Sequence, residues 1–252
     1  MRVLGTELYD KGFDQLISDS LIILDGQPKN LLISPSDANV LVTAKMDADF
    51  AKILHQYHWN LPDGVPSVWM LKWKGAKQAN RCSGPDYFKS MVVSTAKKQL
   101  NHYLCGGAPG VAEALKLTCQ RWGNHQIVGT HCPPFKTLSE EEIMEIADDI
   151  NSKKVDMVWV GLGAPKQIYF AHRLAKYTQV KLIVTIGAAF DFHTGRVKKA
   201  PNFVQGMGLE WLYRLAKEPK RLAKRYFKIV PLFILFNLLE MKCFLTKSRG
   251  KR

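Results

Sequence analysis

The stretch that decides the fold reads DMVWVGLGAPKQ at residues 156–167 and VKLIVTIGAAFDFHTGRVKKAP at residues 180–201. Its apolar runs, Met157–Val160 and Leu182–Ile186, are rich in β-branched residues and too short for helices, so they predict buried strands. Each run ends in a glycine turn, which is where parallel α/β sheets bind ligands. We therefore expect a ligand-binding edge, with these polar residues in its turns: Lys166, Gln167, Asp191 and His193.

The chain upstream alternates short apolar runs with helical patterns. This alternation predicts βαβ units on a mostly parallel sheet flanked by helices, a Rossmann-like α/β fold. Further strands are predicted at Asn30–Ser34, His102–Cys105 and Gln126–Val128. Helices are predicted at 12–22, at 38–54 with a break near Lys45–Asp49, at Val65–Trp73, at Val111–Cys119 and at Ser139–Asn151, where Glu142 has capping-box spacing. Arg81–Tyr87 is predicted to be a loop.

The net charge of +14 on 252 residues is unevenly distributed. Residues 214–252 contain 12 Lys and Arg against 2 acidic residues, whereas the other 213 residues carry 24 against 20. The excess therefore belongs to the tail and predicts a local anionic partner. A hydrophobic fraction of 46% is typical of a globular protein and excludes global disorder.

The tail combines basic and apolar segments. Glu210–Lys217 and Pro219–Lys228 are predicted as two helices, because proline suits a first turn. Ile229–Leu239 then supplies eleven nearly uninterrupted apolar residues, short of the ~20 that a spanning helix needs. This combination is typical of an interfacial anchor on an anionic membrane surface. We predict an α/β core at 1–205 and a helical membrane-associating appendage at 206–252; a core helix or a contact between copies of the chain is the alternative for the apolar stretch.

Several classes of site are disfavoured. Five cysteines, with no CxxC pair, indicate neither a disulfide framework nor a zinc knuckle, and a reducing cytosol fits. The N-terminus lacks the apolar region of a signal peptide. No metal site or cofactor is predicted, because neither His55 with His58 nor His131 with Cys132 has a third ligand nearby. The tail's charges adjoin aliphatic residues rather than stacking aromatics, which favours a membrane over nucleic acid.

Two turns leave their chemistry open. Gly106–Gly110 follows a strand and precedes a helix, so it is either a phosphate cradle or a plain tight turn. It does not match GxGxxG, which argues against a nicotinamide oxidoreductase. Asp63, in the PDG turn, is either an ordinary turn residue or a general base in a cleft.

Motifs along nearly the whole chain resemble those of the bacterial WecG/TagA/CpsF glycosyltransferases. They are LPDG at 61–64, RCSGPD at 81–86, CGGAPGV at 105–111, GLGAPKQ at 161–167, IGAAFDFHTGRVKKAP at 186–201 and GLEWLYRLAKEPKR at 208–221. The resemblance implies inverting, metal-independent transfer of a sugar from a nucleotide donor, here a UDP-sugar, to a polyprenyl-diphosphate-linked acceptor. It places this reaction in surface polysaccharide or teichoic acid assembly, on the cytoplasmic side of the cell membrane.

The resemblance also implies roles for individual residues. Asp63 becomes the catalytic base, with Arg81, Gln167 and Ser34 beside the reacting groups. Gly106, Gly107, Gly163 and Asp191 fall in the nucleotide-sugar-binding turns. Arg214, Arg221 and one of Lys224 and Arg225 match the tail residues that meet the lipid diphosphate, since guanidinium groups engage phosphate bidentately.

Two positions depart from the family pattern. The family's threonine-x-asparagine appears as Ser34-Pro35-Ser36, which lacks the amide, and the acidic residue after PKQ is Ile168. We expect the second change to remove a charge near the sugar. A non-catalytic nucleotide-binding module with a nucleic-acid-binding tail is the alternative function, and its test is salt-sensitive binding of oligonucleotides without binding of UDP.

Overall fold

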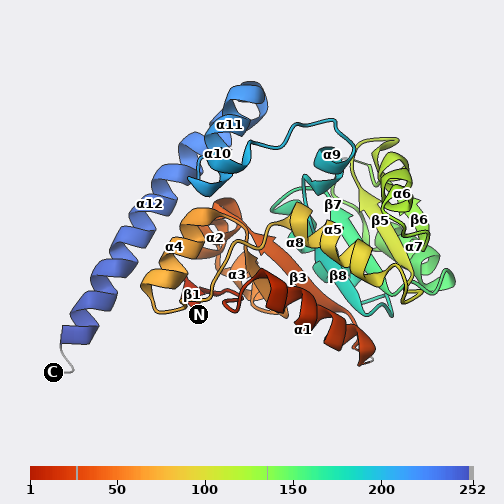
Figure 1. Ribbon diagram of the computed structural model, residues 1–252, viewed down its shortest axis with the longest axis horizontal. Helices are drawn as coiled ribbons and strands as arrows, with labels where there is room; N and C mark the ends of the chain where they lie inside the picture. Colours follow the sequence, from red (N-terminus) through yellow and green to blue (C-terminus); the bar gives the residue numbers. More distant parts are fainter. Residues whose placement is uncertain (27, 135, 250–252) are drawn as a thin grey trace.

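The computed structural model describes residues 1–26, 28–134 and 136–249 (Figure 1). Its centre is a six-stranded sheet in the order β4-β3-β8-β7-β5-β6, with every neighbouring pair parallel. The predicted Rossmann-like sheet is therefore confirmed. The strands are β3 (Leu31–Ser36), β4 (Trp59–Pro62), β5 (His102–Gly106), β6 (Ile127–His131), β7 (Met157–Gly161) and β8 (Leu182–Thr185), and a small antiparallel pair is formed by β1 (Arg2–Val3) and β2 (Thr6–Glu7).

Helices cover both faces of this sheet (Figure 1). Met157 and Trp159 of β7 pack with α1, α5, α6 and α9 on one face, while Val158 and Val160 pack with α2, α3, α7 and α8 on the other. A strand buried on both faces needs a continuous apolar run, which β7 has. These helices are α1 (Phe13–Asp25), α2 (Ala38–Met46), α3 (Ala48–Leu54), α5 (Gly84–Thr95), α6 (Val111–Arg121), α7 (Glu140–Ser152), α8 (Lys166–Leu174) and α9 (Ala189–His193).

The predicted break between α2 and α3 and the predicted capping box are both present. Asp47 ends α2 and begins α3, where its side chain accepts hydrogen bonds from the amides of Asp49 and Phe50. Ser139 and Glu142 form the reciprocal capping box of α7. Local side-chain chemistry therefore sets these helix boundaries.

The prediction of a loop over Arg81–Tyr87 was wrong from Gly84 onward. The side chain of Ser83 accepts a hydrogen bond from the amide of Asp86, and Pro85 occupies the first turn, so α5 begins inside the predicted loop. A glycine and a proline next to each other are typical of turns. At this position, however, they follow an N-cap serine, and proline is favoured at the start of a helix.

The C-terminal segment contains α10 (Asn202–Gly206), α11 (Glu210–Lys217) and the 31-residue α12 (Pro219–Arg249). The predicted end of the second tail helix at Lys228 was wrong, because α12 continues through Pro231. The proline removes one intrahelical hydrogen bond. Packing of the following turns against the core supplies the stabilisation that keeps the helix continuous.

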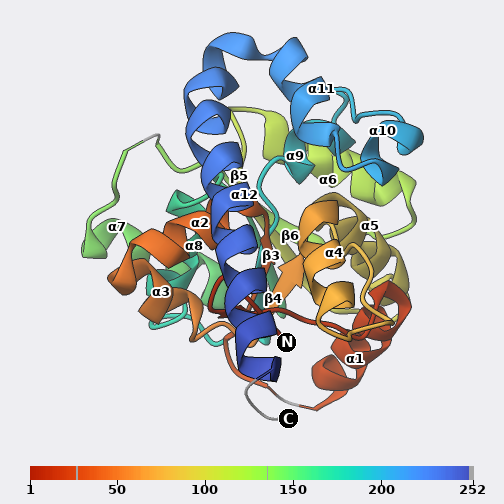
Figure 2. The same ribbon diagram turned by 90° about the vertical axis from the view of Figure 1, so that its left-hand side faces the viewer.

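One side of α12 is docked on the core and the other side is exposed (Figures 1 and 2). Ile229 and Phe233 are buried against Leu4, Leu41 and Leu71, the last of which belongs to α4 (Val65–Trp73). Nearer the C-terminus, Glu240 accepts a hydrogen bond from the Leu4 amide at 3.0 Å and pairs with Lys74 at 2.9 Å. The opposite side exposes Phe227, Ile234, Leu235, Leu238 and Leu239. Across the ranges that the structure describes, no helix has the length and apolarity needed to span a bilayer.

Candidate functional site

A cleft of about 950 Å³ opens where the parallel strands end, with α11 and α12 on its other side. Its lining includes Pro35 near the end of β3, the turns that follow β5, β7 and β8, and residues 132–134 and 136–138 after β6. Ligands bind at this edge of open α/β sheets. The predicted site residues that line the cleft are Asp63, Arg81, Gly107, Gly163, Gln167, Asp191, Arg214, Arg221 and Arg225, whereas Ser34, Gly106 and Lys224 do not.

Asp63 follows the last residue of β4 and faces the cleft with 27% of its side chain exposed. Its Oδ1 atom is buried and accepts no hydrogen bond within the described part of the chain. Burial raises the pKa of this carboxyl to about 7; the positive charge of Arg81 opposes the shift, and the negative charge of Glu210 adds to it. A carboxylate with a pKa near the working pH is suited to accept a proton.

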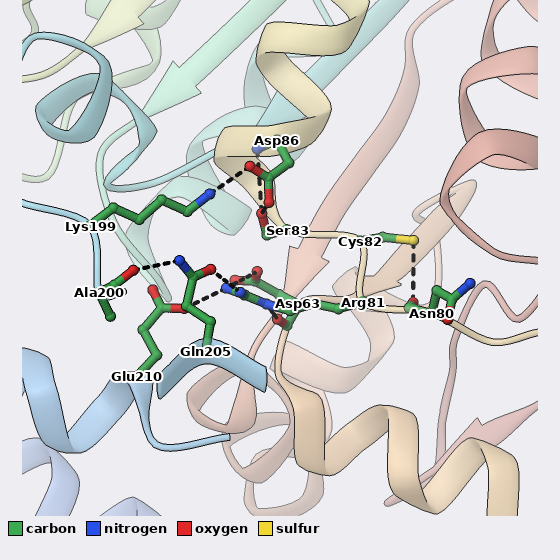
Figure 3. A network of polar contacts seen from close by, with 10 residues as sticks. All are labelled: Asp63, Asn80, Arg81, Cys82, Ser83, Asp86, Lys199, Ala200, Gln205 and Glu210. Atoms are coloured by element: carbon green, nitrogen blue, oxygen red, sulfur yellow. Dashed lines mark hydrogen bonds and ion pairs between the residues drawn. The ribbon is translucent and has the colours of Figure 1, made fainter. Parts of the chain in front are cut away.

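Arg81 is held by three hydrogen bonds (Figure 3). Its Nε donates to the backbone carbonyl of Asp63, its Nη1 to Oε1 of Gln205 and its Nη2 to Oε2 of Glu210, each at 2.6 Å. The Oδ1 atom of Asp63 lies 3.8 Å from Nη2. Arg81 thus connects the turn after β4 to both α10 and α11. The sequence reasoning did not single out Gln205 or Glu210, although Glu210 lies inside the GLEWLYRL motif.

A second polar contact holds the segment after α9 (Figure 3). Asp86 accepts hydrogen bonds from Lys199 at 2.6 Å and from the Ser83 hydroxyl at 2.5 Å. Burial works to raise the pKa of Asp86, but these two donors and nearby positive charges outweigh it, and the net shift is downward. His193 was expected at the ligand edge, but its Nε2 lies 2.9 Å from the Pro85 carbonyl, and the residue does not line the cleft. Two residues of the FDFHTGRVKKAP motif, His193 and Lys199, therefore contact the first turn of α5, while others such as Asp191 and Arg196 line the cleft.

The turns after β5 and β7 approach each other so closely that they require glycine. Gly106 has a φ of +138°, and a Cβ atom there would lie 2.6 Å from backbone atoms of Gly161. Gly107 has a φ of +77°, and its Cβ would lie 2.9 Å from Val111. Gly106 shapes the cleft from behind, while Gly107 and Gly163 form part of its wall.

Gln167 is only 4% exposed, and its side chain contacts the turns that follow β7 and β8. Its Oε1 accepts a hydrogen bond from the Gly163 amide at 3.1 Å, and its side chain lies next to Gly187. Asp191 lines the same part of the cleft, 3.6 Å from Nε of Arg196. Ser34 lies behind the wall, where its hydroxyl accepts a hydrogen bond from Thr185 at 3.1 Å.

Both residues that depart from the family pattern are buried. Ile168 is fully buried in the hydrophobic core and does not line the cleft. The expectation that this side chain alters the charge near the sugar was therefore wrong, because the helix directs it into the core. Ser36 is also buried, and its hydroxyl donates to the Ser34 carbonyl at 3.2 Å.

Arginines of α11 and α12 form the cationic side of the cleft. Arg214 lies over the Phe192 ring at 5.5 Å, and Arg221 pairs with Glu218 at 2.5 Å. The Nε atoms of Arg214 and Arg225 are buried and have no hydrogen-bond partner among the described residues. Lys224 is exposed and lies outside the cleft lining, so Arg225 is the better placed of the two candidates at this turn. Donors of this kind bind phosphate oxygens.

A search for metal ligands found no group of three or more His, Cys, Asp or Glu side chains arranged to hold an ion, within the residues that the structure describes. The five cysteines are all free thiols. What the cleft does contain is a partly buried carboxylate, glycine turns and guanidinium groups, which are suited to proton transfer beside a phosphate-bearing ligand.

The chain was compared with models of known protein families. The model described as the glycosyl transferase WecG/TagA/CpsF family matches residues 1–247, nearly the whole chain. The family acts in surface polysaccharide synthesis and in general uses a sugar-nucleotide donor and a lipid-linked acceptor. The match spans both the sheet and the C-terminal helices, and it agrees with the motifs that line the cleft. The chain belongs to the WecG/TagA/CpsF family of glycosyltransferases.

Proposed function

We propose that this glycosyltransferase moves a sugar, with inversion, from a UDP-sugar to a hydroxyl of a polyprenyl-diphosphate-linked saccharide. The observation that carries the proposal is the setting of Asp63. Its carboxyl has a pKa of about 7 and a buried oxygen without a partner in the described residues, and it shares one cleft with glycine turns and arginines.

In the proposed reaction Asp63 takes the proton of the acceptor hydroxyl. The oxygen of that hydroxyl forms a bond to the anomeric carbon of the donor sugar as the bond from this carbon to the β-phosphate oxygen breaks. The bonding electrons leave with UDP, so a single displacement inverts the anomeric configuration. A base of this kind contributes about 10²- to 10⁴-fold to the rate.

The donor and the acceptor would enter from opposite sides of the cleft. Gly107, Gly163 and Asp191 line the side formed by the sheet, where we place the nucleotide sugar, and Gln167 fixes the shape of that wall. The helical side is lined by Arg214, Arg221 and Arg225, and we place the acceptor diphosphate there. The Nε atoms of Arg214 and Arg225, which are buried and have no hydrogen-bond partner in the described part of the chain, support this assignment.

The reaction is tested by mixing the full chain with a panel of UDP-sugars and a polyprenyl-diphosphate-GlcNAc analogue and measuring UDP release. One UDP-sugar is expected to give release that depends on acceptor, and NMR of the product is expected to show an inverted anomeric centre. Asp63→Asn is expected to lose transfer but still bind UDP. Full activity of this variant would contradict the role of Asp63, and oligonucleotide binding without UDP binding would favour the alternative module.

We further propose that the exposed apolar side of α12 rests on the cytoplasmic membrane surface, which would bring the lipid acceptor to the arginines. The exposed leucines Leu235, Leu238 and Leu239 lie on the side of the helix opposite the docked Ile229 and Phe233. Replacing the three leucines by serine is expected to reduce co-sedimentation with anionic phospholipid vesicles without unfolding the protein. The matched control is Ile22→Ser, an exposed apolar residue on α1. Equal sedimentation of the triple variant and the control would refute the proposal.

A further inference from the structure

We infer that Glu210 is a positioning residue for the reaction, because it holds the guanidinium of Arg81 away from the carboxylate of Asp63. The inference rests on the proposed function of Asp63 as the base. It concerns a contact between α11 and the segment before α5, at the junction between the predicted core and the predicted appendage.

The guanidinium of Arg81 is hydrogen-bonded to Glu210 and not to Asp63. Nη2 is 2.6 Å from Oε2 of Glu210, a strong charge-assisted hydrogen bond, but 3.8 Å from Oδ1 of Asp63, which is beyond hydrogen-bonding distance. Oε1 of Gln205 accepts a hydrogen bond from Nη1 at 2.6 Å, so α10 and α11 together fix the guanidinium. The inner oxygen of Asp63 consequently keeps no hydrogen-bond partner among the described residues.

Without the carboxylate of Glu210, the nearest negative group to Nη2 is Asp63. A small rotation of the guanidinium would bring it within hydrogen-bonding distance of Oδ1. An opposite charge at such a distance lowers the pKa of a carboxyl by about 1 to 3 units. Asp63 would then be a weaker base, and one of its oxygens would be occupied.

The charged and titratable groups around Asp63 come from several elements. Arg81 and Arg214 attract a negative charge at this position, while Glu210 and Asp37 repel it. The Cys82 thiol points to the Asn80 carbonyl at 3.5 Å, and burial raises its pKa to about 12, so it stays neutral at working pH. Loss of Glu210 removes a negative charge that repels the Asp63 carboxylate, and it frees the positive charge of Arg81 to approach it. Both effects lower the pKa of Asp63.

This contact makes the base dependent on the position of α11. Glu210 is the first residue of α11, and no side chain of that helix is fully buried. The helix is therefore held by a few contacts, which include Glu210 on Arg81 and Arg214 over Phe192. If α11 moved off the core, Arg81 would be released toward Asp63 and Arg214 would leave the cleft with the helix, so the base would weaken as that arginine is lost.

The experiment compares the wild-type full chain with Glu210→Gln, Glu210→Asp and the control Asp49→Asn, which removes an exposed carboxylate paired with Lys52 on α3. The first readout is the pH profile of kcat/KM, whose acidic limb reports the base. The second is a ¹³C titration of the Asp63 carboxyl, which needs no activity.

For Glu210→Gln we expect the acidic limb and the ¹³C titration to move down by about 1 to 3 pH units and the rate at pH 8 to fall about 10-fold, within what a base contributes. Glu210→Asp and Asp49→Asn are expected to keep the wild-type titration. In an Arg81→Gln background the same Glu210→Gln change is expected to shift Asp63 much less, because no guanidinium is released.

An Asp63 titration that Glu210→Gln leaves unchanged, or shifts equally in the Arg81→Gln background, would overturn the inference. A wild-type chain that transfers no sugar would instead overturn the proposed function, and the ¹³C titration would still decide the role of Glu210. If Glu210→Gln melts below the assay temperature, two other comparisons of the Asp63 titration replace it. The first compares the double variant with Arg81→Gln, and the second compares Glu210→Asp with the wild type. A shift of the Asp63 titration by Asp49→Asn as large as the shift by Glu210→Gln would also overturn the inference.

Discussion

Replacing Asp63 by asparagine is expected to stabilise the protein at neutral and alkaline pH while it stops sugar transfer. The carboxyl is mostly buried, and in the folded state its pKa is raised from 3.8 to about 7. The negative charge is therefore less favourable in the folded protein than in the unfolded chain. Asparagine has nearly the same shape and carries no charge, so it removes this penalty.

The size and the pH range of the effect follow from the shift. Below pH 3.8 the Asp63 carboxyl is protonated in both the folded and the unfolded state, so there is no charge to destabilise the folded protein. The cost grows as the pH rises from 3.8 to about 7 and is constant above that. A shift of about 3 units corresponds to about 4 kcal/mol. Because 27% of the side chain is exposed to solvent, we expect about 2 to 4 kcal/mol in practice.

The assay is chemical denaturation of wild type and Asp63→Asn at pH 4, 5.5, 7 and 8, with UDP absent. The difference in unfolding free energy is expected to be near zero at pH 4 and to reach its full size by pH 8. All other titrating groups are common to the two proteins and cancel in the difference. A difference that does not change with pH would refute the raised pKa, and with it the argument that burial prepares Asp63 to act as a base.

Three other changes test the framework of the site. His102 is fully buried, and burial lowers its pKa to about 4. Its contribution to stability should therefore be lost as the pH falls from 6.5 toward 4. In denaturation experiments, the difference in unfolding free energy between wild type and His102→Asn should shrink over that range by about 3 kcal/mol. Gly106→Ala should lower the free energy of unfolding by more than about 2 kcal/mol, since its Cβ would lie 2.6 Å from Gly161. The control is Gly110→Ala, because Gly110 has a positive φ but open space around it. The midpoint of denaturation of this control should fall much less. Glu240→Ala removes the carboxylate that pairs with Lys74 and accepts from the Leu4 amide, and it should weaken the docking of α12 by about 1 to 3 kcal/mol. The change is seen as faster amide hydrogen exchange over residues 229–241, whereas unchanged exchange would show that apolar packing alone holds the helix.

Most of the sheet was predictable because buried parallel strands are continuous apolar runs. Met157–Val160, Leu182–Ile186 and His102–Cys105 were predicted as strands, and the structure confirms them to within one residue. The helix Val65–Trp73 was predicted with its observed bounds. Glycines immediately after the strands indicated the ligand edge, because the turns there require positive φ or close backbone approach.

The elements that were missed depend on tertiary contacts. The helix α5 carries a glycine and a proline in its first turn, and its position is decided by the Ser83 cap together with burial of Tyr87 and Phe88. Likewise, α12 crosses Pro231 because Ile229 and Phe233 are packed on the core. Local propensity favours a break at such residues, and no short-range pattern shows that the fold compensates for it.

The candidate site was predictable in part. Asp63 and Arg81 stood out only through the resemblance to the family, since an aspartate in a PDG turn is usually an ordinary turn residue. The partners of Arg81 were not predictable. Gln205 and Glu210 lie more than 120 residues away along the chain, and only the folded geometry brings them to the same guanidinium. Their roles, like those of the other site residues, remain proposals.

The continuity of α12 has a mechanical consequence. At 1.5 Å per residue the helix is about 46 Å long, and the same rod carries Arg225 at the cleft and Glu240 on the Lys74 anchor. The two points are about 22 Å apart along its axis. If the helix moves as one rigid body, a displacement of its outer part also moves Arg225. A load on the exposed apolar side would then reach the cleft without any change in secondary structure.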